Sequence, residues 1–232
     1  MSDALIRDWT DALPQKFKKA SHGVNKQTGL SNLFRAIVLG PSMSGKNNLV
    51  FDFLKKSPSI YTHLHIICRN PDQSIYDYLK EKLAGHITFY DPQEPPPTVD
   101  QIKENGLQLV VIDDYSNDKM LQKNVFSHFF TRGRHKGLST MFLSHSYFAT
   151  DKMIRLNSEY VMILRANSKR DLQMLLKDFP IRGVDDSGLF KAYQEATAQR
   201  GQFLKVDGVQ QKLFKNWGTK FHWIADEKKS YP

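Results

Sequence analysis

Short apolar runs alternate with longer amphipathic segments over most of this chain. The runs at 35–40, 62–69 and 107–114 are rich in β-branched or other apolar residues and end on Gly, Arg or Asp, which is typical of short buried strands. The segments between them carry apolar residues at helical spacing, as at Leu49 and Phe53. This alternation predicts a mostly parallel sheet with helices on both faces.

The same pattern continues to the C-terminal part of the chain. We expect further strands at 86–91, 138–146 and 159–166, helices at 72–85, 118–131, 168–179 and 186–197, a first helix that Pro58 closes, a proline-rich loop at 92–98, and a closing β-hairpin with Asp207-Gly208 at its turn. The fold class is therefore α/β with a C-terminal hairpin. We divide the chain into a basic N-terminal arm at 1–32, one domain at 33–217 and a tail at 218–232.

Length and composition exclude several classes of protein. The 232 residues are enough for one α/β domain with a substantial core. Cys68 is the only cysteine, which excludes an intrachain disulfide and a cysteine-rich metal site, and its apolar surroundings predict burial. No segment approaches the roughly 18 consecutive apolar residues of a membrane span. The mixed, acidic start is unlike a secretory signal peptide.

The chain carries a formal net charge of +9 at pH 7. Such an excess suits a polyanionic partner, although it is also found in basic proteins that bind no nucleic acid. Basic residues are interleaved with aromatic ones at 14–29 and 212–223, so both segments are candidate nucleic-acid surfaces.

A glycine-rich motif directly follows the first predicted strand and precedes a helix. Its glycines permit a sharp turn, its backbone N–H groups can surround phosphate, and Lys46 can reach the β- and γ-phosphates of a nucleotide. The context of strand, loop and helix makes this a phosphate-binding loop. The predicted nucleotide-binding residues are Gly40, Pro41, Ser42, Met43, Ser44, Gly45, Lys46, Asn47 and Asn48.

Asn47 departs from the phosphate-loop pattern, which asks for Ser or Thr at this position. A hydroxyl there would ligate Mg²⁺ directly. The carbonyl oxygen of an asparagine can also ligate Mg²⁺, or act through water, but its side chain is one atom longer. We therefore name Asn47 as a candidate metal ligand, with slow hydrolysis as the alternative expectation.

An apolar run ends on two carboxylates, Asp113 and Asp114. The carboxyl edge of a parallel sheet is where open α/β folds bind ligands. At that edge Asp113 would hold Mg²⁺, directly or through water, and Asp114 would be the general base for an attacking water. A strand-end turn or a helix cap is the alternative interpretation of such a pair.

Two arginines and a histidine flank the next predicted strand. Arg132 and Arg134 follow the end of a helix, where they could project into a neighbouring subunit's site or could simply be a solvated helix end. His145 and Ser146 follow the strand and are placed to sense phosphate or position water; a structural role is the alternative for a lone histidine.

The combination of GPSMSGK, LVVIDD, FTRGRHKGLSTMFLSHSYF, DKMIRLNSEYVMIL and the final FLKV…QQKLFKNW resembles the viral genome-packaging ATPases of the FtsK–HerA superfamily. The branch it resembles includes poxviruses, other large DNA viruses, virophages and Polinton-like viruses. The resemblance covers about residues 33–217, and its most specific part is the GRH element with the S-x-S-Y-F and I-R-x-N runs.

The resemblance implies a RecA-like P-loop NTPase core that binds ATP and Mg²⁺, assembles with itself into a pentameric or hexameric ring, and moves double-stranded DNA into a preformed capsid. Lys46 would then be the phosphate lysine, Asp113 the metal carboxylate and Asp114 the catalytic carboxylate. Arg134, with Arg132 second, would act in trans. Capsid proteins would be partners, and the virion or a viral factory in the host cytoplasm would be the location.

Departures and competing functions accompany this resemblance. His145 stands where many relatives have Gln, and the roles of Arg155 and Asn157 in the I-R-x-N run stay open. A P-loop kinase would need an arginine-rich lid and an acceptor pocket. A nucleotide-gated DNA-binding or scaffold protein with weak or no turnover would explain Asn47. For a motor, the segments 165–172 and 205–212 are the candidate basic loops facing DNA.

Overall fold

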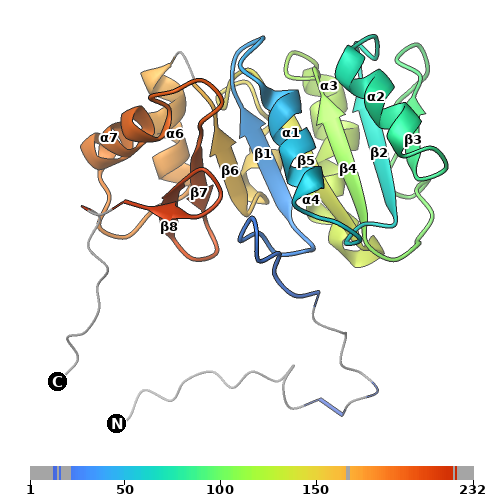
Figure 1. Cartoon of the computed structure of the whole chain (residues 1–232), viewed down its shortest axis with the longest axis horizontal. Coiled ribbons are helices and arrows are strands. Elements are labelled where there is room, and N and C mark those ends of the chain that lie inside the picture. The colour runs from blue at the N-terminus through green and yellow to red at the C-terminus, as the bar shows by residue number, and fades with distance from the viewer. Residues whose placement is uncertain (1–12, 15, 17–21, 166–167, 222, 224–232) are drawn as a thin grey trace.

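The computed structural model describes residues 13–14, 16, 22–165, 168–221 and 223 of the chain (Figure 1). Its strands are β1 (Arg35–Leu39), β2 (His63–Cys68), β3 (Ile87–Tyr90), β4 (Gln108–Asp113), β5 (Leu138–Ser144), β6 (Tyr160–Ile163), β7 (Leu204–Asp207), β8 (Lys212–Lys215) and β9 (Thr219–Lys220). Its helices are α1 (Lys46–Lys55), α2 (Ser74–Lys82), α3 (Lys119–Leu121), η2 (Gln122–Phe126), α4 (Ser127–Thr131), η3 (Gly133–Lys136), α5 (Lys152–Leu156), α6 (Lys169–Asp178) and α7 (Asp186–Ala196).

The nine strands of the described residues form one sheet in the order β3-β2-β4-β5-β1-β6-β7-β8-β9. The strands from β3 to β6 in this order pair in parallel, so their carboxyl ends lie along one edge. The pairs β6–β7, β7–β8 and β8–β9 are antiparallel. The parallel part of the sheet is therefore extended by antiparallel strands, which include the predicted C-terminal hairpin.

Each face of the sheet packs against its own apolar layer. On one face Ala36 and Val38 of β1 pack with Leu49 and Phe53 of α1. The alternate β1 residues belong to the layer that includes residues of α4, α6 and α7. Figure 1 shows α1 and α2 in front of the sheet, with α4 behind it. Period-two strands buried on both faces explain why these runs are almost wholly apolar.

The predicted strands and helices of the domain are confirmed, with differences in detail. The helix expected over 118–131 contains a π-helical turn, η2. Gln122 in this turn is fully buried and donates to the backbone oxygens of Tyr115 and Ser116. These two hydrogen bonds attach the π-helical turn to the loop that follows β4. The short helix α5 and strand β9 were not predicted.

The turn of the C-terminal hairpin differs from the expected tight Asp-Gly turn. Asp207 pairs with Lys212 inside the strands, so residues 208–211 form the loop. The left-handed conformation falls on Gln211, with φ of 54°, and not on Gly208. The side chain of Asp207 accepts a hydrogen bond from the backbone N–H of Gln210, which closes the wider turn.

Two candidate DNA-contacting segments of the C-terminal part, 205–212 and 212–223, contain side chains that the fold buries. Lys205 is only 2% exposed and donates to the backbone oxygens of Thr28 and Trp217, so it cannot reach DNA from the hairpin. The aromatic side chains of Phe214, Trp217 and Phe221 are buried, which leaves none of these three free to stack on bases. Lys205 instead ties the segment before β1 to the sheet.

Part of the candidate arm at 14–29 lies outside the described residues, and so do residues 166 and 167 of the other candidate DNA loop. Within the described ranges, no helix is both long and apolar enough to cross a membrane.

Candidate nucleotide-binding site

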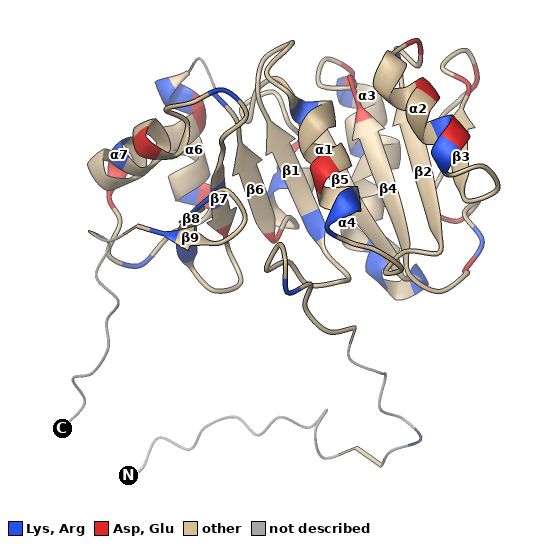
Figure 2. Cartoon of the chain, viewed as in Figure 1, with Lys and Arg blue, Asp and Glu red and all other residues tan. Residues whose placement is uncertain are grey.

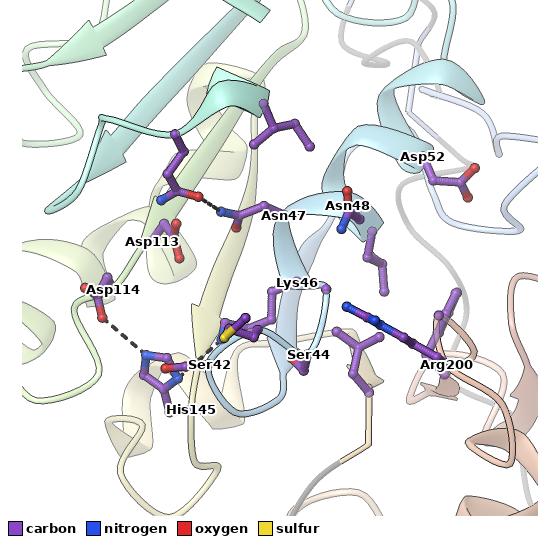
Figure 3. A pocket seen from close by; sticks show the side chains of 18 of the residues that line it. Ser42, Ser44, Lys46, Asn47, Asn48, Asp52, Asp113, Asp114, His145 and Arg200 are labelled. Carbon is purple, nitrogen blue, oxygen red and sulfur yellow. Dashed lines mark hydrogen bonds and ion pairs between the residues drawn. The ribbon is translucent and has the colours of Figure 1, made fainter. Parts of the chain in front are cut away.

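A pocket of about 780 Å³ lies at the carboxyl edge of the parallel strands. Its walls come from the segments that follow β1, β2, β4 and β5, which are neighbours in the sheet. The side chains of Lys46, Asn47, Asp113, Asp114 and His145 all line it (Figure 3). The structure thus brings together most of the residues that the sequence singled out.

The phosphate loop, residues 40–46, needs its two glycines for different reasons. Gly45 has φ of 100°, a left-handed conformation that residues with a Cβ rarely adopt. At Gly40 a Cβ atom would lie 2.4 Å from Oγ of Ser44, so this glycine permits the loop to fold closely on itself. Helix α1 then begins with neither a side-chain cap nor an acidic residue in its first turn. Its free N–H groups and positive dipole end favour an anion.

Lys46 is buried, and its ammonium group makes three contacts. Its Nζ atom lies 2.8 Å from the Gly40 oxygen, 3.1 Å from the Pro41 oxygen and 3.3 Å from Nδ1 of His145. An ammonium group has three N–H donors, so these contacts can use all of them. Burial lowers the pKa of Lys46, against the charges of Asp113 and Asp114, which raise it. In this conformation the lysine is bound to its own loop and would exchange those contacts on meeting a phosphate.

Asp113 is the last residue of β4, and its carboxylate is buried beside Lys46. The Tyr76 hydroxyl donates to its Oδ2 atom at 2.7 Å. Burial raises the pKa of Asp113, while the Tyr76 hydrogen bond and the Lys46 charge lower it. Tyr76 was not predicted. It fixes one carboxylate oxygen and leaves the other for a ligand.

Asp114 adopts a left-handed backbone conformation with φ of 66°. Its two carboxylate oxygens have different partners: Nδ2 of Asn70 at 2.7 Å and Nε2 of His145 at 3.2 Å. The backbone N–H of His145 is in turn held by Oγ of Ser116. Non-glycine residues seldom take this conformation, and here it occurs directly after the strand, at the pocket.

The amide of Asn47 faces the N-terminal end of α2. Its Nδ2 atom donates to Oε1 of Gln73 at 2.6 Å, and Nε2 of Gln73 donates to the backbone oxygen of Asn70 at 2.9 Å. Neither Asn70 nor Gln73 was predicted, although both follow the second apolar strand. Sequence position alone does not tell that this strand lies beside β4.

Arg200 also lines the pocket, on the side away from Asp113 and Asp114 (Figure 3). It comes from the loop between α7 and β7, together with Gly201 and Phe203. Its guanidinium group adds a positive charge where an anionic ligand would lie. No motif marks this residue, so it could not be predicted from the sequence.

Arg132 and Arg134 lie outside this pocket. They stand next to the amino end of β5, whereas the phosphate loop follows the carboxyl end of the parallel strand β1. Arg132 and Lys136 pair with Asp100, and Arg134 is exposed. Figure 2 shows basic residues along this lower edge of the sheet. In one chain neither arginine reaches the site, so a catalytic role would have to be played in a neighbouring subunit.

The arginine of the I-R-x-N run has a structural role. Nε of Arg155 donates to Oδ2 of Asp178 at 2.9 Å, and its guanidinium group stacks on the ring of Tyr147. The Tyr147 hydroxyl also donates to Asp178. Asn157 caps the end of α5 by donating to the Met153 oxygen. These contacts join α5 to the end of α6, away from the pocket.

The oxygen atoms at the pocket suit Mg²⁺. Asp113 offers a carboxylate and Asn47 an amide oxygen, both hard ligands that Mg²⁺ prefers, and Mg²⁺ completes its shell with water and phosphate. Among the described residues, no three or more His, Cys, Asp or Glu side chains form a metal cluster. Asp113 and Asn47 could therefore hold the ion only together with nucleotide and water.

No protein-family model matches the sequence, and no curated protein matches it in a sequence search. Solved structures do resemble the fold. The genome packaging NTPase B204 from Sulfolobus turreted icosahedral virus 2, in complex with AMPPCP, has a TM-score of 0.59 at 14% identity, over 82% of this chain and 100% of that chain. This chain has the fold of a P-loop ATPase. The predicted fold class and the resemblance stated from sequence are confirmed at this level.

Two further structures support the same conclusion about the fold. B204, the DNA-packaging ATPase from Sulfolobus turreted icosahedral virus, has a TM-score of 0.58 at 12% identity, covering 82% of this chain and 98% of that one. The cytoplasmic domain of the type VII secretion ATPase EccC from Thermomonospora curvata has a TM-score of 0.57 at 13% identity, covering 90% of this chain and 29% of that one. Different cellular tasks are thus built on this fold, and function has to be argued from the site.

Proposed function

We propose that this protein is an ATP-hydrolysing motor that moves double-stranded viral DNA into a preformed capsid. The observation that carries the proposal is the convergence of Lys46, Asp113, Asp114 and His145 in one pocket beside the free N-terminus of α1. A phosphate loop alone would support nucleotide binding. The two carboxylates and the histidine add groups that can orient and deprotonate a water molecule.

Each of these residues would have its own role in ATP binding and hydrolysis. The phosphates of ATP would lie on the N–H groups of the loop and α1, and Lys46 would leave the Gly40 and Pro41 oxygens to contact them. Asp113 and Asn47 would hold Mg²⁺, which neutralises charge on the phosphates. Asp114 would accept the proton of the attacking water. His145, which contacts both Lys46 and Asp114, would link phosphate occupancy to the position of that base.

The motor would work as a homo-oligomeric ring of five or six subunits. Arg134, or Arg132, would then stabilise the transferring phosphoryl group in the neighbouring site. The net charge of +9 suits a protein that holds DNA by its phosphates without reading sequence. We place the protein in the virion or in a viral factory of the host cytoplasm, with capsid proteins as partners.

Asn47 favours a second candidate function, a nucleotide-gated DNA-binding or scaffold protein with weak or no turnover. An amide at this position could impair the metal site without impairing phosphate binding. Asn47→Thr separates the two candidates. A large gain in phosphate release over an almost inactive wild type would support the scaffold, and an already active wild type with no gain would support the motor.

Triplex displacement tests movement along DNA directly. A third strand annealed to a duplex is released when a motor passes through it, so the assay measures translocation separately from ATP turnover. The wild type should displace the third strand only with ATP, and Lys46→Ala should not. Displacement that Lys46→Ala retains, or its absence in a wild type that hydrolyses ATP rapidly, would contradict the motor.

A further inference from the structure

A chain of hydrogen bonds holds the side-chain amide of Asn47 in one orientation. A backbone carbonyl can only accept, so the Asn70 oxygen requires that Gln73 present its nitrogen there, at 2.9 Å. The Oε1 atom of Gln73 is thereby left to face Asn47, which must present its own nitrogen, at 2.6 Å. The orientation of both amides therefore follows from one backbone group.

The oxygen of Asn47 is left for the pocket by this arrangement. No residue in the described part of the chain donates to its Oδ1 atom, and Asn47 lines the pocket beside Asp113 (Figure 3). Asn47 thus donates to Gln73 and offers an acceptor to a ligand in the pocket.

Serine or threonine would perform both tasks with one hydroxyl group, which is a donor and an acceptor at the same atom. Asparagine divides the tasks between two atoms, and a half-turn of the amide would exchange them. The turned amide would place an N–H₂ group where a cation needs an oxygen. An asparagine at this position therefore needs a neighbour that fixes the amide.

We propose that Gln73 is a positioning residue that keeps Oδ1 of Asn47 toward the phosphates and Mg²⁺, which allows asparagine to occupy the place of Ser or Thr. The loop between β2 and α2 also holds Asp114 through Asn70, at 2.7 Å, so it organises two pocket residues at once. This inference rests on the proposed function, because it assumes a nucleotide–Mg²⁺ complex in the pocket.

A double-mutant cycle in binding, without turnover, tests it. The affinity for AMPPCP is measured with Mg²⁺ and with EDTA in the wild type, Gln73→Met, Asn47→Thr and the double variant. Gln73→Met should reduce the Mg²⁺-dependent gain in affinity by about tenfold, because partners that orient metal ligands are typically worth 10–100-fold in metal affinity. The affinity in EDTA should stay unchanged. In the Asn47→Thr background the same substitution should change the gain by less than about twofold, because a hydroxyl needs no amide partner.

Gln73→Glu is the matched control, since its carboxylate can still accept from Asn47 and it should keep more of the gain than Gln73→Met. Thermal unfolding verifies that each variant is folded. An equal loss in both backgrounds would show that Gln73 acts through α2 alone and would overturn the inference, as would an unchanged gain in Gln73→Met. If Mg²⁺ changes affinity in neither the wild type nor Asn47→Thr, the proposed function fails as well.

Discussion

Nδ1 of His145 lies 3.3 Å from Nζ of Lys46. A lysine ammonium group can only donate, so this contact makes Nδ1 the acceptor and leaves the ring proton on Nε2. Nε2 in turn faces Oδ1 of Asp114, at 3.2 Å, and donates to it. The neutral histidine is thus a connection between the phosphate lysine and the candidate base.

This connection predicts different outcomes for two substitutions of His145. Glutamine can accept from Lys46 and donate to Asp114, so His145→Gln should keep phosphate release within about tenfold of the wild type. His145→Leu can do neither, and we expect a loss on the order of 100-fold, the usual lower value for a positioned acid–base group. ATP affinity, measured in parallel, should change little. Equal rates in both variants would show that the histidine is not a polar link.

Arg200 should contribute to binding independently of the metal. Its side chain lines the pocket on the side away from Asp113, so Arg200→Ala removes a positive charge near an anionic ligand without altering the Mg²⁺ ligands. We expect nucleotide affinity to fall about tenfold, equivalent to roughly 1.4 kcal/mol, by the same factor with Mg²⁺ and with EDTA. The exposed Lys103→Ala serves as the control. A loss confined to the Mg²⁺ condition would contradict this role.

The ion pair of Arg155 and Asp178 should contribute to stability and not to catalysis. Both side chains are mostly buried, at 13% and 16% exposed. Arg155→Met leaves a buried carboxylate without its charge partner, and such a loss typically costs about 3–5 kcal/mol of unfolding free energy. Lys80→Met, which removes the exposed pair with Asp77, should cost less than about 1 kcal/mol. Urea denaturation compares the two. Similar costs would contradict the structural role of Arg155.

His65 should make the protein less stable in mild acid. It is buried between the Tyr90 hydroxyl and Gln108, at 3.0 Å from each. Burial lowers the pKa of His65, and the neighbouring His63 lowers it further, against the Gln108 hydrogen bond, which raises it. A folded-state pKa below the unfolded value of about 6.5 means that this contribution is full above pH 6.5 and is lost as pH falls toward the folded-state pKa.

The urea midpoint of the wild type should therefore decrease from pH 7.5 to pH 5.5. His65→Gln removes the titrating group and should flatten that decrease, although other groups keep part of it. An equally steep decrease in His65→Gln would contradict the assignment of the pH dependence to His65. Both proteins are measured at each pH. A difference in the urea midpoint itself is then distinguished from a difference in how steeply the midpoint depends on pH.

Much of the fold could be predicted because its strands are buried on both faces. Val110 and Val111, for example, point to opposite faces of β4 and are both buried, so the run reads as continuously apolar. The strand order could not be read from this pattern. Asn70 and Gln73 become parts of the site only because β2 lies beside β4, and Arg200 because the α7–β7 loop reaches the phosphate loop.

Other differences arise where a side chain meets a partner far along the chain. Lys205 carries a charge in a predicted surface hairpin, yet its ammonium group is held by the oxygens of Thr28 and Trp217. Gln122 lies in a π-helical turn, and its amide bonds to the loop after β4. A local pattern gives no information about such distant partners. It did mark Lys46, Asp113 and Asp114, because strand ends and a glycine-rich loop are local features.

The central claim is that ATP hydrolysis in the pocket drives the movement of DNA. Its most direct test is phosphate release by the purified protein with Mg²⁺ and ATP, with and without double-stranded DNA, in the wild type and in Lys46→Ala. We predict measurable turnover in the wild type, stimulation by DNA, and a loss of both in Lys46→Ala. Turnover that is the same in the two proteins, with and without DNA, would contradict the claim.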